Sequence, residues 1–166
     1  MDSTKIEKLL SANKRTRKYF LGCFAADEIP TFIDKFPASL VINLDTKDKP
    51  GSHWVAAFVE NFSKVYYFDS MGSLNCLYPK QFRPNPFCIS GPNSFIYDFL
   101  NRFESVIVNK NVFQTIFTTN CAHYCIFFIH AMSVGIPFNK ITSMLNNNSD
   151  PNNFVFQFVN NILNGQ

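Results

Sequence analysis

The chain contains one cysteine whose local sequence suits nucleophilic chemistry. Cys121 opens an apolar stretch of helical length, 121–134, and follows three residues that can cap a helix, Thr118, Thr119 and Asn120. A thiolate attacks a carbonyl carbon far better than a thiol does, and a helix N-terminus beside an imidazolium lowers the pKa of a cysteine. We therefore expect Cys121 to be a nucleophile if Asn120 caps the helix and a histidine lies beside it.

His53 and Asp69 can supply the other two groups of a catalytic triad. His53 begins one predicted strand and Asp69 follows the next, and the segment between the two strands has a length suited to a hairpin. The start of the first strand of an antiparallel hairpin lies beside the end of the second, so these side chains can meet. His53 would be the base and Asp69 would orient it. Asp98 and Glu104 are less favoured orienting groups, because neither follows a strand paired with that of His53.

Acyl transfer at such a site also requires donors for the negatively charged oxygen of the transition state. Gln114 stands seven residues before Cys121 and offers a side-chain amide. The backbone N–H of Cys121 offers a second donor. Removal of one such donor typically costs about 3 kcal/mol of transition-state stabilisation.

The stretch that begins at Cys121 also contains residue types that bind zinc. These are Cys121, His123, Cys125 and His130. On one helix, residues 121 and 125 share a side whereas 123 points elsewhere, and the stretch has no Cys-x-x-Cys pair. We therefore expect no metal, and we interpret Cys125 as a small buried hydrophobic residue and both histidines as ordinary helix residues.

Hydrophobic periodicity and turn residues predict the elements that must position these side chains. The predicted strands are 39–44, 53–59, 64–68, 105–108 and 112–117. The predicted helices are a first one behind a capping signature of Thr4 and Glu7, 93–103, 121–134, and a last one that begins at Asp150 and Pro151. The segment 19–22 and the prolines after it predict an irregular connection.

The composition predicts one folded domain that spans 1–166. The 166 residues are 46% hydrophobic and 16% charged, which is enough apolar material for a sizeable core. No run approaches the roughly 18 apolar residues of a spanning helix, and the first residues lack the apolar middle of a secretory signal. The five cysteines are an odd count without such a signal, which favours reduced thiols and an intracellular protein.

A basic cluster lies near the N-terminus of a chain whose net charge is only +3. It consists of Lys14, Arg15, Arg17 and Lys18. A polyanion such as DNA could bind there. The simpler interpretation is a solvated helix end, because cations near a helix C-terminus are favourable for local reasons alone.

The candidate catalytic residues stand in motifs that resemble those of a known protease family. The segments 51–54 and 67–72, followed by Gln114 and Cys121, resemble in order and spacing the catalytic elements of the adenovirus-type endopeptidases (adenain). They also resemble those of the related SUMO-specific deconjugating proteases. The segment 19–22 and the interval of seven residues from Gln114 to Cys121 are similar to those of the viral branch.

The resemblance implies an α+β fold related to papain, with a mixed sheet packed against a central helix that carries the nucleophile at its N-terminus. It implies Cys121 as nucleophile, His53 as base and then acid, and Asp69 as orienting group. It further implies that Gln114 lies in the oxyanion hole and that Trp54 forms a wall of the substrate cleft.

The resemblance also implies a function, without a cofactor or metal. We expect a monomeric cysteine endopeptidase of a DNA virus or virus-like transposon that cleaves capsid precursor proteins in the virion or in the host nucleus or cytoplasm. One alternative is an isopeptidase that removes a SUMO-type modifier from its conjugates. Another is a non-catalytic DNA-binding or packaging module with the same fold.

Three positions depart from the family pattern. Ala122 and then His123 follow Cys121, where the family usually has glycine directly after its nucleophile. Asp69 stands where adenovirus enzymes commonly have glutamate and the deconjugating branch has aspartate. Phe103 occupies about the place of the cysteine that tethers a peptide activator in adenovirus enzymes. We therefore do not expect a peptide activator, whereas activation by DNA stays open.

Overall fold

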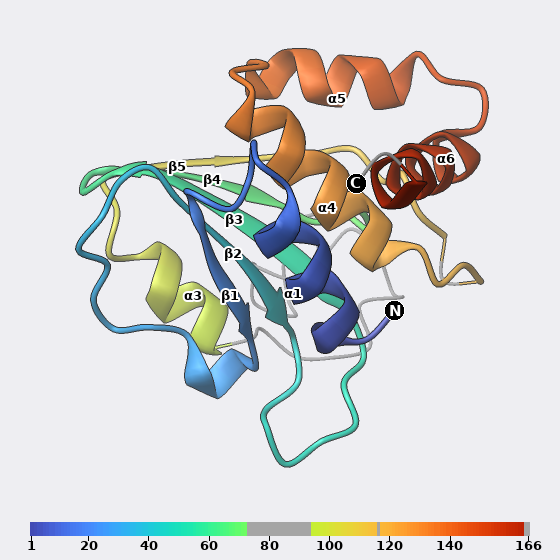
Figure 1. Cartoon of the computed structure of the whole chain (residues 1–166). Helices are drawn as coiled ribbons and strands as arrows, with labels where there is room; N and C mark the ends of the chain where they lie inside the picture. Colours follow the sequence, from blue (N-terminus) through green and yellow to red (C-terminus); the bar gives the residue numbers. More distant parts are fainter. Residues whose placement is uncertain (73–93, 116, 165–166) are drawn as a thin grey trace.

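A five-stranded mixed sheet forms the centre of the molecule, which is described here by a computed structural model of residues 1–72, 94–115 and 117–164 (Figure 1). The strands are β1 (Phe20–Phe24), β2 (Ala38–Asn43), β3 (Trp54–Asn61), β4 (Lys64–Phe68) and β5 (Ser105–Val108), and they lie in that order across the sheet. The three middle strands are antiparallel, and each edge strand runs parallel to its neighbour. The predicted mixed sheet is confirmed.

Helices cover both faces of this sheet. One face is covered by α1 (Ser3–Ala12), α4 (Cys121–Ser133), α5 (Phe138–Asn146) and α6 (Pro151–Asn164), and the other by α3 (Ser94–Leu100) (Figure 1). A short 3-10 helix, η1 (Ala26–Glu28), follows β1. Because both faces are covered, β2 is buried at every position, which explains its continuous apolar run. None of the described helices combines the length and the hydropathy that a membrane span requires.

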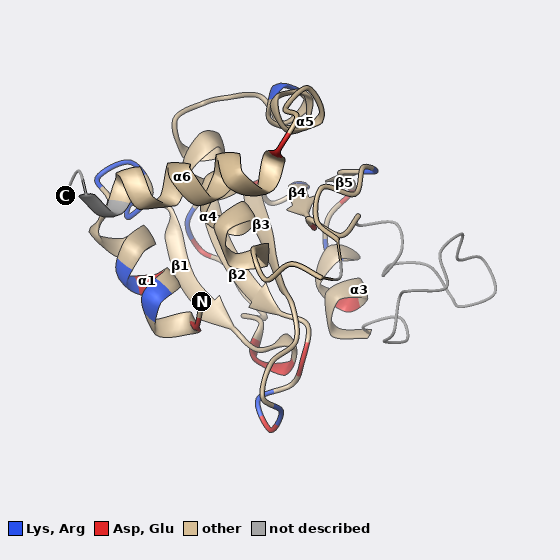
Figure 2. Ribbon diagram, turned by 90° about the vertical axis from the view of Figure 1, so that its right-hand side faces the viewer, with Lys and Arg blue, Asp and Glu red and all other residues tan. Residues whose placement is uncertain are grey.

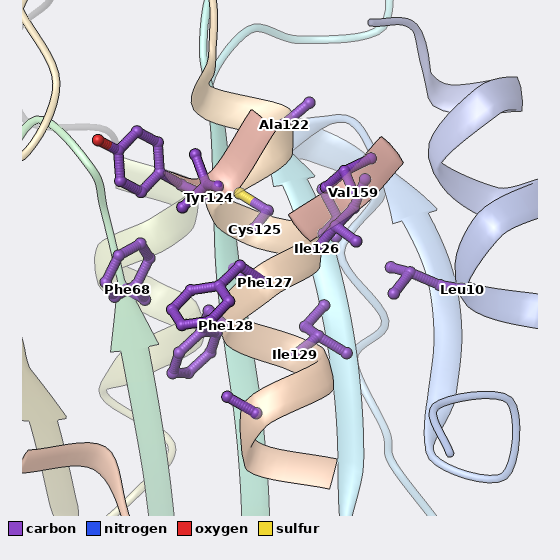
Figure 3. Close-up of a cluster of buried hydrophobic side chains, with 14 of the residues drawn as sticks. Leu10, Phe68, Ala122, Tyr124, Cys125, Ile126, Phe127, Phe128, Ile129 and Val159 are labelled. Atoms are coloured by element: carbon purple, nitrogen blue, oxygen red, sulfur yellow. The ribbon is translucent and has the colours of Figure 1, made fainter. Parts of the chain in front are cut away.

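Helix α4 packs against the sheet and also contacts α1 and α6. Leu10 of α1 and Val159 of α6 belong to the same buried cluster as the residues of α4 (Figure 3). The aromatic ring of Phe128 stacks on that of Phe68 in β4, with 5.0 Å between ring centroids. Apolar neighbours on all sides explain why this helix is hydrophobic around its whole circumference. The predicted central helix is confirmed.

The N-terminal part of the chain differs from the sequence-based expectation in two respects. Segment 20–24 is a strand, because it pairs in parallel with β2, a partner that its own sequence does not reveal. Helix α1 is capped by Asp2, whose Oδ1 accepts a hydrogen bond of 2.9 Å from the N–H of Lys5. Glu7 does not form the predicted capping box with Thr4. Instead its Oε1 accepts the N–H of Cys23 at 3.1 Å and connects α1 to β1.

Two further elements were predicted incorrectly. The described residues of 112–117 form no strand, because the N–H groups of Phe113 and Gln114 donate to the carbonyl of Ser70 instead of to a sheet partner. Helix α5 was not predicted. Its N-cap position is Pro137, which makes no side-chain capping bond, so the usual signal for a helix start is missing. The last helix begins at Pro151 as predicted, and Asp150 Oδ1 accepts the N–H of Asn153 at 3.0 Å.

Replacement of Phe128 by alanine is expected to reduce the free energy of unfolding by about 3–5 kcal/mol, because it leaves a cavity between α4 and the sheet. Urea denaturation measures this difference. Phe32→Ala is the matched control, since this side chain is 75% exposed, and it should change stability by about 0.5 kcal/mol or less. Equal losses in the two variants would contradict the proposed packing role of Phe128.

Candidate active site

A cavity of about 680 Å³ lies where the N-terminus of α4 meets the ends of the central strands. Four of the predicted site residues, His53, Trp54, Gln114 and Cys121, line this cavity. Asp69 lies behind His53 and is fully buried. The structure thus brings together residues from a hairpin, a loop and a helix that are far apart in the sequence.

His53 and Asp69 meet at the edge of the sheet, as the hairpin predicts. Ala56 of β3 pairs with Phe68 of β4, so the residue before β3 lies close to the residue after β4. The distance between His53 Nε2 and Asp69 Oδ1 is 2.7 Å, and His53 is only 7% exposed. Because Nε2 is engaged by the carboxylate, the other ring nitrogen is left for Cys121.

Asn109 holds the backbone of Asp69 from the other side. Its Oδ1 accepts the N–H of Asp69 at 2.9 Å, and its Nδ2 donates to the carbonyl of Asp69 at 2.7 Å. The Asp69 carboxylate also accepts the N–H of Met71 at 2.8 Å. These bonds leave the carboxylate little freedom. Sequence reasoning missed Asn109, although a polar residue directly after β5 is a signal for a role at the sheet edge.

The charges of His53 and Cys121 stabilise each other. Burial disfavours the imidazolium, but the charge and hydrogen bond of Asp69, together with the contact to Cys121, raise the pKa of His53 to about 10. Burial also disfavours the Cys121 thiolate. The hydrogen bond and charge of His53 outweigh this effect, with help from backbone hydrogen bonds at Trp54 and Ala122, and lower the pKa of Cys121. The arrangement therefore favours a thiolate–imidazolium pair.

The start of α4 differs from the expected capped helix. Asn120 occupies the N-cap position, but its side chain makes no capping bond, and its Nδ2 donates to the carbonyl of Asn152 at 3.5 Å. The condition that the Asn120 side chain caps the helix is therefore not met. The thiolate is stabilised instead by the imidazolium and by backbone hydrogen bonds at Trp54 and Ala122.

Gln114 is held at both ends of its side-chain amide. Its Oε1 accepts a hydrogen bond of 2.7 Å from the Ser70 hydroxyl, and its Nε2 donates to the carbonyl of Thr118 at 2.7 Å. The residue is 2% exposed and lines the cavity beside Cys121. Trp54 is half-buried in the cavity wall, and its Nε1 donates to the carbonyl of Met1 at 3.2 Å.

The alternative residues lie elsewhere. Asp98 and Glu104 are exposed, in and after α3, and do not line the cavity. Cys125 is buried, and burial raises its pKa well above the ordinary value. Burial lowers the pKa of His123 and of His130. In the described part of the chain, no three His, Cys, Asp or Glu side chains converge on a point where a metal ion could bind.

The basic cluster lies away from the cavity. Lys14, Arg15, Arg17 and Lys18 lie on the turn that follows α1 (Figure 2). All four are exposed, and none of them lines the cavity. Phe103 packs its ring edge-on against Phe99, with centroids 5.5 Å apart.

Cys121, half-buried at the cavity, thus lies beside the buried pair of His53 and Asp69. Residues 28–154 match the Ulp1 protease family, C-terminal catalytic domain, and the chain belongs to this family. The expected relationship to adenain and the SUMO-specific proteases, and with it the papain-related fold, is confirmed.

Individual proteins that are similar to this chain include two viral proteases. A candidate thiol protease of Acanthamoeba polyphaga mimivirus is 31% identical over 128 residues, which is 75% of this chain and 36% of that protein. The crystal structure of a protease of ASFV matches with a TM-score of 0.42 and 19% identity, over 70% of this chain and 42% of that one. The chain therefore spans about a third of the length of the mimivirus relative.

The pKa shifts generate a prediction for the reactivity of Cys121. Its alkylation rate, plotted against pH, should have a midpoint below the ordinary thiol value of 9.0. Asp69→Asn should move this midpoint upward, because the loss of the carboxylate lowers the pKa of His53 and so removes the positive charge that stabilises the thiolate. Peptide mass spectrometry after brief treatment with limiting iodoacetamide measures the rate at Cys121 alone.

Cys23 is the internal control for this experiment. Burial and the nearby charge of Glu7 raise its pKa to about 12, so it should react slowly in both proteins. Identical pH curves for Cys121 in the wild type and in Asp69→Asn would contradict the electrostatic coupling. Cys76 and Cys88 lie outside the described residues and are distinguished from Cys121 by the peptide in which the label is found.

Proposed function

We propose that this chain is a cysteine endopeptidase that hydrolyses peptide bonds through an acyl-enzyme on Cys121. The observation that carries the proposal is the buried contact of 2.7 Å between His53 and Asp69, next to a cysteine whose pKa is lowered. The buried carboxylate keeps the imidazole protonated, and the imidazolium keeps the neighbouring thiol ionised. A thiolate held in this way is an activated nucleophile.

In the first step, the Cys121 thiolate attacks the carbonyl carbon of the scissile bond. The carbonyl oxygen becomes negatively charged and is stabilised by the side-chain amide of Gln114 and the backbone N–H of Cys121. His53 then donates its proton to the leaving amine, and the C–N bond breaks to leave a thioester on Cys121.

In the second step, neutral His53 removes a proton from a water molecule as this water attacks the thioester. Collapse of the second tetrahedral intermediate releases the carboxylic acid product and restores the thiolate beside a protonated His53. Asp69 keeps the imidazole ring oriented in both steps and stabilises its charged form. Trp54, at the wall of the cavity, would contact the substrate chain.

We propose capsid precursor proteins of a DNA virus or virus-like transposon as the substrates, acted on in the virion or in the host nucleus or cytoplasm. The similarity to a thiol protease of a mimivirus supports the viral part of this proposal. Removal of a SUMO-type modifier is the second candidate, because the family that the chain belongs to is named after Ulp1. Cleavage of a modifier conjugate in preference to capsid precursors would select the second candidate.

The variants Cys121→Ala and His53→Ala should each reduce kcat/KM by at least about 10³-fold, because neither retains an activated nucleophile. Release of fluorescent fragments from a peptide library measures the activity. Cys125→Ala and His130→Ala are matched controls on α4 and should stay within about threefold of the wild type. Residual cleavage by Cys121→Ala would contradict the proposal, and inertness of Cys121 towards iodoacetamide would favour a non-catalytic module.

The basic cluster is proposed as a DNA-binding surface and as the route by which DNA could activate the enzyme. All four cations are exposed, and the turn that carries them is anchored by the buried Thr16, whose hydroxyl donates to the carbonyl of Leu10. The anchored backbone keeps the four charges close together. Since they lie outside the cavity, DNA could bind there while the cavity holds a substrate.

Replacement of all four cations by alanine should weaken DNA binding and reduce the slope of log K against log salt by about 3–4, because each phosphate contact contributes roughly 0.9. Fluorescence anisotropy at several salt concentrations measures the slope. Cleavage of short peptides in the absence of DNA should not change. An unaltered DNA affinity would support the simpler interpretation of a solvated helix end.

A further inference from the structure

Ser70 connects two groups of the proposed catalytic machinery. It directly follows Asp69 and is 1% exposed. Its hydroxyl donates a hydrogen bond of 2.7 Å to Gln114 Oε1. Its carbonyl accepts the N–H of Phe113 at 2.8 Å and that of Gln114 at 2.9 Å. Three hydrogen bonds thus hold Gln114 and its neighbour against the residue that follows the buried carboxylate.

The orientation of the Gln114 amide decides whether it can stabilise an oxyanion. Its nitrogen end donates two hydrogen bonds, whereas its oxygen end only accepts them and would repel a negative charge. One hydrogen of Nε2 is used by the carbonyl of Thr118, and the amide nitrogen carries a second one. Because Gln114 lines the cavity together with Cys121, this second hydrogen is the one that the amide would offer to the oxygen of a bound substrate.

Ser70 supplies the partner that keeps the oxygen end away from the cavity. Without the hydroxyl, Oε1 would be a buried acceptor that lacks its donor, and such a group is unfavourable in a site that is 2% exposed. A rotation that exchanged the two ends of the amide would offer an N–H to position 70, but it would place Oε1 against the carbonyl of Thr118 and turn it towards the thiolate and the developing oxyanion. Ser70 and Thr118 thus hold the amide in one orientation from its two ends.

We propose that Ser70 is a positioning residue for oxyanion stabilisation, because its hydroxyl fixes the side-chain amide of Gln114 with Nε2 directed at the oxygen of the tetrahedral intermediate. This inference rests on the proposed function. Two consecutive residues after β4 would then position two groups of the site, because Asp69 orients His53 and Ser70 orients Gln114.

The test separates the oxyanion step from the reactivity of the thiolate. Ser70→Ala should lower kcat for a cleaved peptide by about 10-fold, with KM within about twofold, because the amide acts only on the charge that develops in the transition state. Affinity for an aldehyde analogue of that peptide should fall by a similar factor, since addition of Cys121 to the aldehyde forms a tetrahedral oxygen. Alkylation of Cys121 by iodoacetamide should stay unchanged, because this displacement forms no oxyanion.

A double-variant comparison tests whether Ser70 acts through Gln114. In the background of Gln114→Ala, the additional change Ser70→Ala should have no further effect on kcat. Ser70→Thr retains the hydroxyl and should recover most of the activity. Ser133→Ala, at the far end of α4, is the matched control and should behave as the wild type. Thermal unfolding of each variant shows whether it is folded.

Several outcomes would overturn the inference. One is an unchanged kcat in Ser70→Ala, and another is a parallel loss of alkylation, which would mean that Ser70 only supports Asp69 or the fold. Multiplicative effects in the double variant would show that Ser70 does not act through Gln114. Failure of the wild type both to cleave peptides and to alkylate rapidly at Cys121 would instead reject the proposed function, and this inference with it.

Discussion

The hydrogen-bonded junction between the end of β4 and the segment after β5 is the constraint on which the site depends. Asn109 bonds both backbone groups of Asp69, and Ser70 accepts the N–H groups of Phe113 and Gln114. These bonds replace the sheet ladder at the point where the sheet ends, so the backbone groups buried there keep their partners. They also fix the positions of Asp69 and Gln114 relative to each other, although Ser70 and Gln114 are 44 positions apart in the sequence.

The electrostatics of the site follow from this junction. Asp69 is fully buried, and a buried carboxylate is stable only if hydrogen bonds and an opposite charge compensate its loss of water. The imidazolium of His53 supplies that charge, and it in turn stabilises the thiolate of Cys121. The order of the three groups, from the fully buried carboxylate to the cysteine that lines the cavity, leaves the reactive atom where a substrate can reach it.

The correct sequence-based predictions concern elements with strong local signals. The β3–β4 hairpin was readable from two aromatic and β-branched runs around a short turn, and α4 from its length and uninterrupted apolar content. The incorrect ones concern segments whose conformation depends on distant partners. Segment 20–24 becomes a strand only because β2 lies beside it, and 112–115 lacks a strand because Ser70 takes the N–H groups that a sheet would use.

The sequence by itself determined which residues are available for thiol chemistry, their order along the chain, and the hairpin that brings His53 close to Asp69. These depend on residue types and on short-range periodicity, which act over a few neighbours in the chain. The tertiary structure decided the partners of Gln114, the role of Asn109 and the failure of Asn120 to cap α4. A polar side chain bonds to whichever donor or acceptor lies about 3 Å away, and only the packed chain determines which group that is.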